Sequence, residues 1–188
     1  MRLTITAGLA GAFLLGRAKP EGLALMETTP EGAWRSFAAA LVCLPAFLAI
    51  RFFAWASIGV PEGGLARSLT AEVIGYAIAW AGFALLSLPL AHAWGRIGEW
   101  PRFIAAWNWT NIVQYLVLLV LAVPGAIGLP DGVAQGLMLL GLAYALWLEW
   151  FVARIALNLD GGRAAMLVIV DMVLGLFLGG VIRALSGG

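Results

Sequence analysis

The chain has 188 residues, of which 63% are hydrophobic and 11% are charged, and its formal net charge is +1. About a quarter of the residues of a soluble domain are charged, so this composition excludes a water-facing surface around the whole protein and makes the lipid bilayer its solvent. The near balance of 11 Lys and Arg against 10 Asp and Glu provides no basic surface for nucleic acid.

The first apolar stretch, residues 3–16, is short for a membrane span and is followed by Arg17 and Lys19. We expect a short helix that lies in the membrane interface, with these basic side chains near the lipid headgroups. One alternative is a signal peptide cleaved at Gly16-Arg17-Ala18, although Arg17 within that site is unfavourable. A sixth span is the other alternative.

Five apolar runs follow and predict membrane-spanning helices over residues 35–57, 70–93, 103–123, 133–153 and 164–183. The connections between them are short and rich in Pro and Gly, so successive helices should be antiparallel. Thr28-Thr29-Pro30-Glu31 is typical of a helix cap with proline in the first turn. The predicted fold is all-α, with an N-terminal cytoplasmic or interfacial segment (1–33) and a polytopic bundle of five transmembrane helices (34–188).

The distribution of basic residues predicts the orientation of these spans. Three arginines fall on one side of the five spans, namely Arg51, Arg67 and Arg183. The other side carries eight basic residues: Arg2, Arg17, Lys19, Arg35, Arg96, Arg102, Arg154 and Arg163. The positive-inside rule therefore predicts a bacterial inner-membrane protein with a cytoplasmic N-terminus and an external C-terminus.

Several polar side chains fall within the predicted spans, all in the cytoplasmic half of the membrane. At 1.5 Å per residue, Asp171 lies about 10 Å and Glu149 about 6 Å inside the cytoplasmic boundary. Asn108, Asn111 and Gln114 lie about 8 to 17 Å inside it on the third span. We expect these five residues to form one buried polar cluster, in which Asp171 is either protonated or hydrogen-bonded to an amide such as Asn111.

Three further groups of residues have predicted structural roles. Arg51 and Glu72 match in depth near the outer boundary, so we expect them to form an ion pair. Gly175 and Gly179 form a small-xxx-small face, for which contact with another helix of the same chain is favoured over contact with a second subunit. Seven tryptophans near span ends indicate interfacial belts: Trp34, Trp55, Trp94, Trp100, Trp107, Trp109 and Trp150.

The sequence gives no signature of catalysis. It contains no Gly-x-Ser-x-Gly elbow, no His-Glu-x-x-His motif and no phosphate-binding glycine loop. Cys43 and His92 are the only residues of their types, so neither a disulfide nor a Cys/His metal site is expected, and we predict no cofactor. We therefore expect a non-enzymatic protein.

Two functions agree with these observations. The first is assembly, in which the protein acts as an organising or accessory subunit that contacts itself or another membrane protein through polar and glycine-rich helix faces. The second is a small transporter or channel, in which Glu149 and Asp171 bind and release protons or ions. Assembly is favoured because five helices with short loops offer little room for a gated cavity.

The run Glu31-Gly32-Ala33-Trp34-Arg35-Ser36-Phe37 leads directly into the first span, and four more spans with short loops follow it. This layout resembles small bacterial membrane proteins related to the Yip1 family, although the Asp-Leu-Tyr-Gly-Pro type motif of better-known members is absent. The resemblance implies a five-helix, non-enzymatic protein with a cytosolic N-terminus and a role in membrane organisation or trafficking. It carries over no catalytic residues.

Overall fold

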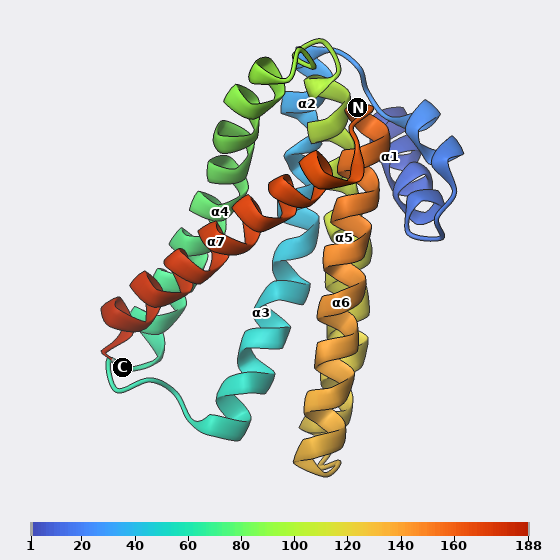
Figure 1. The fold of residues 1–188 in the computed structure, drawn as a ribbon. Coiled ribbons are helices and arrows are strands. Elements are labelled where there is room, and N and C mark those ends of the chain that lie inside the picture. The colour runs from blue at the N-terminus through green and yellow to red at the C-terminus, as the bar shows by residue number, and fades with distance from the viewer. Residues whose placement is uncertain (1, 188) are drawn as a thin grey trace.

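The computed structural model describes residues 2–187, which form helices and no strand (Figure 1). The elements in chain order are α1 (Arg2–Leu15), the 3-10 helix η1 (Pro20–Leu25), α2 (Pro30–Ser36), α3 (Ala38–Ile58), α4 (Leu65–Ala93), α5 (Trp100–Ala126), α6 (Asp131–Ala156) and α7 (Gly161–Ser186). Five helical stretches, with α2 and α3 taken together, are long and apolar enough to cross a membrane. The all-α fold class predicted from the sequence is confirmed.

The five long stretches run alternately up and down the bundle (Figure 1). We call the end that contains Trp100, Ala156 and Gly161 the proximal end, and the end that contains Ile58 and Asp131 the distal end. Each stretch begins two to five residues before its predicted start. The reason is that polar, Pro and Gly residues, which an apolar-run criterion leaves out, form the first turns of these helices.

The caps of two helices show how local sequence sets these starts. Thr29 Oγ1 accepts a hydrogen bond of 3.1 Å from the Gly32 backbone N–H, and Pro30 occupies the first turn of α2. Asp160 Oδ1 accepts hydrogen bonds of 3.0 Å from the backbone N–H groups of Gly162 and Arg163 at the start of α7. Both side chains satisfy donors that have no partner within the helix.

Helix α5 is the central element of the fold. It packs against α3 and α6 along the bundle, and against α1 and α2 near the proximal end. Every residue from Phe103 to Thr110 is buried. Helix α7 instead packs against α4 and α6, and in Figure 1 it crosses the bundle obliquely. The α4 and α7 pair therefore diverges from α3, α5 and α6 toward the distal end.

Two glycines of α4 allow α7 to approach closely. A Cβ atom on Gly75 would overlap the Ile182 side chain, and one on Gly82 would lie 3.1 Å from Leu174 Cδ2. By contrast, a Cβ on Gly175 or Gly179 would meet no heavy atom within 4 Å among the described residues. The contact of Gly175 and Gly179 with another helix of this chain, which the sequence favoured, is therefore not seen, because their Cβ positions face open space.

The N-terminal segment forms a hairpin that is packed against the bundle. Helix α1 lies against α5, where a Cβ on Gly8 would overlap the Trp109 ring. After Leu15 the chain turns back into η1, and the Tyr144 hydroxyl of α6 donates a 2.7 Å hydrogen bond to the Gly16 carbonyl. Ala12 and Leu15 belong to the same buried core as the long helices. The hairpin is thus continuous with the bundle, and its position in the membrane interface stays a prediction.

Aromatic side chains fill the proximal half of the core. Phe83 of α4 stacks on Trp107 of α5 with ring centroids 4.5 Å apart, and Phe103 lies 6.1 Å from Phe83. Trp107 and Trp109 are 5% and 2% exposed, so the prediction that they belong to an interfacial belt is wrong. Their location follows from the central position of α5, which turns most of its circumference toward other helices.

Candidate intramembrane acidic site

Two carboxyl groups, Glu149 and Asp171, lie at similar levels of the bundle on α6 and α7, which pack against each other. Glu149 lies seven residues from Ala156, or about 10 Å along α6 from the proximal end. Asp171 lies on the inner face of α7, in register with the buried residues Leu167 and Leu178. We call these two residues the acidic pair.

The charge of the acidic pair is not balanced by a basic side chain. Glu149 is 5% exposed, and its Oε1 atom has no hydrogen-bond partner within the described residues. The ion pairs of the described side chains involve other acids: Arg51 with Glu72, Arg96 with Glu99 and Arg163 with Asp160. A buried carboxylate without a counter-charge is unfavourable, so this site is suited to binding a proton or another cation.

Two aromatic residues of α5 adjoin the acidic pair. The Trp107 side chain lies within hydrogen-bonding reach of Glu149, and Tyr115 interacts electrostatically with Asp171. About two helical turns separate Trp107 from Tyr115, so these two aromatic side chains lie along one side of α5. Sequence reasoning placed Trp107 in the membrane interface and assigned no role to it, because the spacing of tryptophans near a span end does not reveal which side of the helix is buried.

The amides predicted to join the cluster are engaged elsewhere. Asn108 is fully buried, and its Nδ2 donates a 2.6 Å hydrogen bond to Ser36 Oγ. Asn111 Nδ2 donates a 2.9 Å hydrogen bond to the Trp107 carbonyl of its own helix. Gln114 Nε2 donates a 3.2 Å hydrogen bond to the Ala145 carbonyl of α6. The structure thus gives Asn111 a backbone partner within α5 and not the expected carboxyl of Asp171, whereas Asn108 and Gln114 connect α5 to α2 and α6.

Arg51 and Arg154 contact groups other than the acidic pair. Arg51 Nε of α3 lies 3.2 Å from Glu72 Oε2 of α4, and its guanidinium lies 5.4 Å from the centre of the Phe47 ring. Arg154 is exposed and lies over the Trp150 ring at 5.3 Å. Arg154 therefore does not pair with Glu149, and the structure brings Arg51 and Glu72 together as expected.

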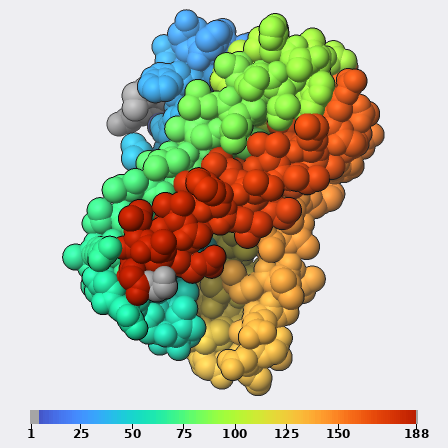
Figure 2. Space-filling model, turned by 60° about the vertical axis from the view of Figure 1, so that its left-hand side comes forward, coloured from blue at the N-terminus to red at the C-terminus, as the bar shows by residue number. Residues whose placement is uncertain are grey.

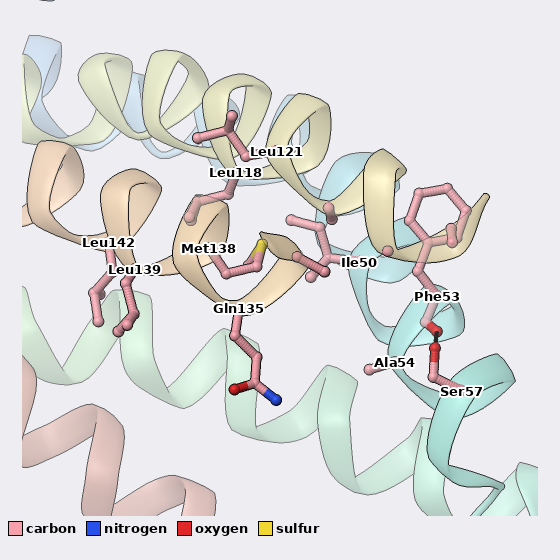
Figure 3. Close-up of a pocket in the computed structure, with 14 residues that line it drawn as sticks. Ile50, Phe53, Ala54, Ser57, Leu118, Leu121, Gln135, Met138, Leu139 and Leu142 are labelled. Atoms are coloured by element: carbon pink, nitrogen blue, oxygen red, sulfur yellow. Dashed lines mark hydrogen bonds between the residues drawn. The ribbon is translucent and has the colours of Figure 1, made fainter. Parts of the chain in front are cut away.

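A groove occupies the distal half of the bundle between α3 and α6. Its volume is about 660 Å³, and α5 forms its floor. Figure 2 shows it as a hollow between the distal ends of α3 and α6, beside α7. In Figure 3 the Met138 side chain lies toward Leu118 and Ile50, and the Gln135 side chain extends away from them. Gln135 and Ser57 are the polar residues among the groove's lining. We call this feature the distal groove.

The distal groove points toward the acidic pair. Leu142 of α6 lines the groove, and Glu149 follows it by seven residues on the same face, about 10 Å nearer the proximal end. Leu118 of α5 also lines the groove, and Tyr115 precedes it by one turn. Beyond the pair, the stacked rings of Phe83 and Trp107 fill the proximal half of the core. Along α5 and α6 the core is therefore packed on the proximal side of the pair and hollowed on its distal side. A second groove of about 640 Å³ opens between α3 and α4 in the proximal half.

No family model matches the chain, and no curated protein or solved structure is detectably similar to it. The resemblance to the Yip1 family therefore stays a prediction. The class that the fold defines is a helical-bundle membrane protein with five candidate spans.

Proposed function

We propose that this protein moves protons, or cations in exchange for protons, across the membrane through the acidic pair Glu149 and Asp171. The observation that carries this proposal is the buried Glu149 carboxyl, which has an unpartnered Oε1 atom and a second carboxyl as its electrostatic neighbour. Ionisable groups inside a membrane-spanning bundle are rare and costly, and a proton or ion path is a common reason for them.

The acidic pair has a physical reason to take up and release a cation. Two carboxylates close together and away from water repel each other, and neither is paired with a basic side chain. A shared proton or a bound cation removes this repulsion. How often the site holds a proton or cation therefore depends on the concentrations of protons and cations on the side of the membrane to which the site is open. A coupled transporter needs this property.

Access from the distal side supports transport over assembly as the main function. A bundle of five helices with short loops is expected to have little internal room, and this counts against transport. The distal groove of about 660 Å³ meets that objection, since it reaches to within about two helical turns of Glu149. The stacked rings of Phe83 and Trp107 lie on the proximal side of the pair, where they obstruct the direct route along α5.

Proton flux into liposomes tests the proposal. Purified protein is reconstituted with a pH-sensitive dye inside, and a potassium diffusion potential drives protons inward. We expect Glu149→Gln and Asp171→Asn to lower the flux at least tenfold. Glu72→Gln is the matched control, because Glu72 lies in a span but is paired with Arg51. Equal flux in wild-type protein, both variants and empty liposomes would overturn the proposal.

A second candidate function is assembly with another membrane protein or with a second copy of the chain. It is supported by Gly175 and Gly179 of α7, which have no heavy atom within 4 Å of their Cβ positions among the described residues. Small residues at such positions permit close helix contacts in membranes. Native mass spectrometry after gentle extraction tests it: Gly179→Leu should dissociate a complex that wild-type protein retains, and a monomer in both samples argues against assembly.

A further inference from the structure

We propose that the cation recognised at the acidic pair is an amphipathic organic cation, whose apolar body occupies the distal groove while its charged group faces Asp171 and Glu149. This inference rests on the proposed function and adds the class of substrate. It is carried by three observations: the size and lining of the groove, its register with the acidic pair, and the aromatic rings that lie between them.

The lining of the distal groove selects for an apolar ligand body. None of its lining residues is charged, and most are aliphatic, such as Leu118, Met138 and Leu142. A small hydrated ion gains nothing from such a surface, and an anion finds no basic partner there. A volume of about 660 Å³ falls within the range of about 300–1,000 Å³ that is typical of sites for drug-sized molecules.

The acidic residue beyond the proximal end of the groove determines which sign of charge a ligand should carry. Glu149 is two turns beyond the lining residue Leu142, so a ligand with its body in the groove needs a charged group within about 10 Å of that body. The unpartnered Oε1 atom of Glu149 is an acceptor that a cation or its N–H groups would satisfy. Charge complementarity therefore favours a cation over an anion or a neutral lipid.

An aromatic group between groove and acidic pair favours an organic cation over a metal ion. Tyr76 lies 4.6 Å from Phe47 and 6.2 Å from Tyr115, measured between ring centres. The Arg51 guanidinium lies 5.4 Å from the centre of the Phe47 ring, which shows that a ring of this group attracts a delocalised cation. Aromatic faces attract weakly hydrated organic cations and compensate little for the lost hydration of a metal ion.

Tetraphenylphosphonium is a suitable probe, because it is apolar, permanently charged and carries no proton. Binding to the full-length protein in dodecyl maltoside is measured by equilibrium dialysis with labelled probe. We expect saturable binding that weakens by up to tenfold per unit of falling pH, since proton and probe compete for the same carboxyls. Tetraphenylborate has the same shape and the opposite charge, and we expect no saturable binding of it.

Three variants locate the site. Glu149→Gln should weaken probe binding at least tenfold, and Ala134→Phe should do the same by filling the groove. Leu140→Trp is the control, because Leu140 lies on the same helix and is 65% exposed on its outer surface. Absent binding, or binding unchanged in Glu149→Gln or Ala134→Phe, overturns the inference. Proton flux that still depends on Glu149 would then leave the proposed function standing, which separates the two claims.

Discussion

Arg51 of α3 and Glu72 of α4 form an ion pair between two helices whose backbones make few close contacts. The Arg51 Nε atom lies 3.2 Å from Glu72 Oε2, and the side chains are 44% and 9% exposed. Phe47 and Tyr76 lie one turn nearer the proximal end of the same two helices, with ring centres 4.6 Å apart. Side-chain contacts such as these connect α3 to α4 along one side of the bundle.

Neutralising either member of this pair should loosen the contact between α3 and α4. We expect Glu72→Gln to lower the free energy of unfolding by about 1–3 kcal/mol, between the values for exposed and buried pairs, because Arg51 is partly exposed. Unfolding in mixed micelles of SDS and dodecyl maltoside measures this change. A double-mutant cycle with Arg51→Gln isolates the pair, and a coupling energy near zero would contradict the prediction.

The hydroxyl of Tyr144 should hold the N-terminal hairpin against α6. Tyr144→Phe removes the 2.7 Å hydrogen bond to the Gly16 carbonyl, and we expect a loss of about 0.5–1.5 kcal/mol. Hydrogen exchange followed by mass spectrometry should show faster exchange within residues 5–25. Tyr76→Phe is the matched control, since its hydroxyl bonds to Ala40 and not to the hairpin. Equal effects of both variants on the hairpin would argue against this role.

Enlarging Gly75 should disturb the contact between α4 and α7. A side chain there would overlap Ile182, so we expect Gly75→Val to cost about 1–3 kcal/mol through overpacking. Gly179→Val is the matched control, because no heavy atom of the described chain lies within 4 Å of its Cβ position. Unfolding in mixed micelles distinguishes the two. An equal loss in both variants would mean that α7 packs by its other face.

The hydrogen bond between Asn108 and Ser36 should stabilise the contact between α5 and α2. Ser36→Ala leaves the fully buried Asn108 amide without its 2.6 Å partner, and Asn108 Oδ1 already lacks one. We expect a loss of about 1–3 kcal/mol, the cost of an unsatisfied buried polar group. Ser57→Ala is the control, since that exposed hydroxyl bonds only to a carbonyl of its own helix. A loss no larger than that of the control would contradict the prediction.

The cap at the start of α7 should make stability depend on pH. Hydrogen bonds from the Arg163 and Gly162 N–H groups hold the pKa of Asp160 below its usual value. The cap's contribution is therefore present above the unfolded-state pKa and is lost as the pH falls through the folded-state pKa. Thermal unfolding of Asp160→Asn, which keeps a capping oxygen but no charge, should lose this acid-dependent part. An unchanged pH profile would contradict the prediction.

Much of the fold could be predicted from apolar run length alone. All five spans are present, and the Thr29 cap lies where the sequence indicated it. The reason is that a bilayer forces each backbone polar group into an internal hydrogen bond, so any sufficiently long apolar run must become a helix. The packing partners were less predictable, since Gly75 and Gly82 mediate the close contact with α7 while Gly175 and Gly179 do not.

By itself, the sequence determined the class of fold, the number of long helices and the depth of the polar residues, because composition and helical rise fix these without reference to neighbours. Only the tertiary structure decided which polar residues meet. Glu149 and Asp171 adjoin because α7 packs against α6, whereas Asn108, Asn111 and Gln114 lie at similar depth and bond to other groups. Depth is set by position along one helix, but contact depends on the rotation and tilt of two helices, and these follow from side-chain packing across the whole bundle.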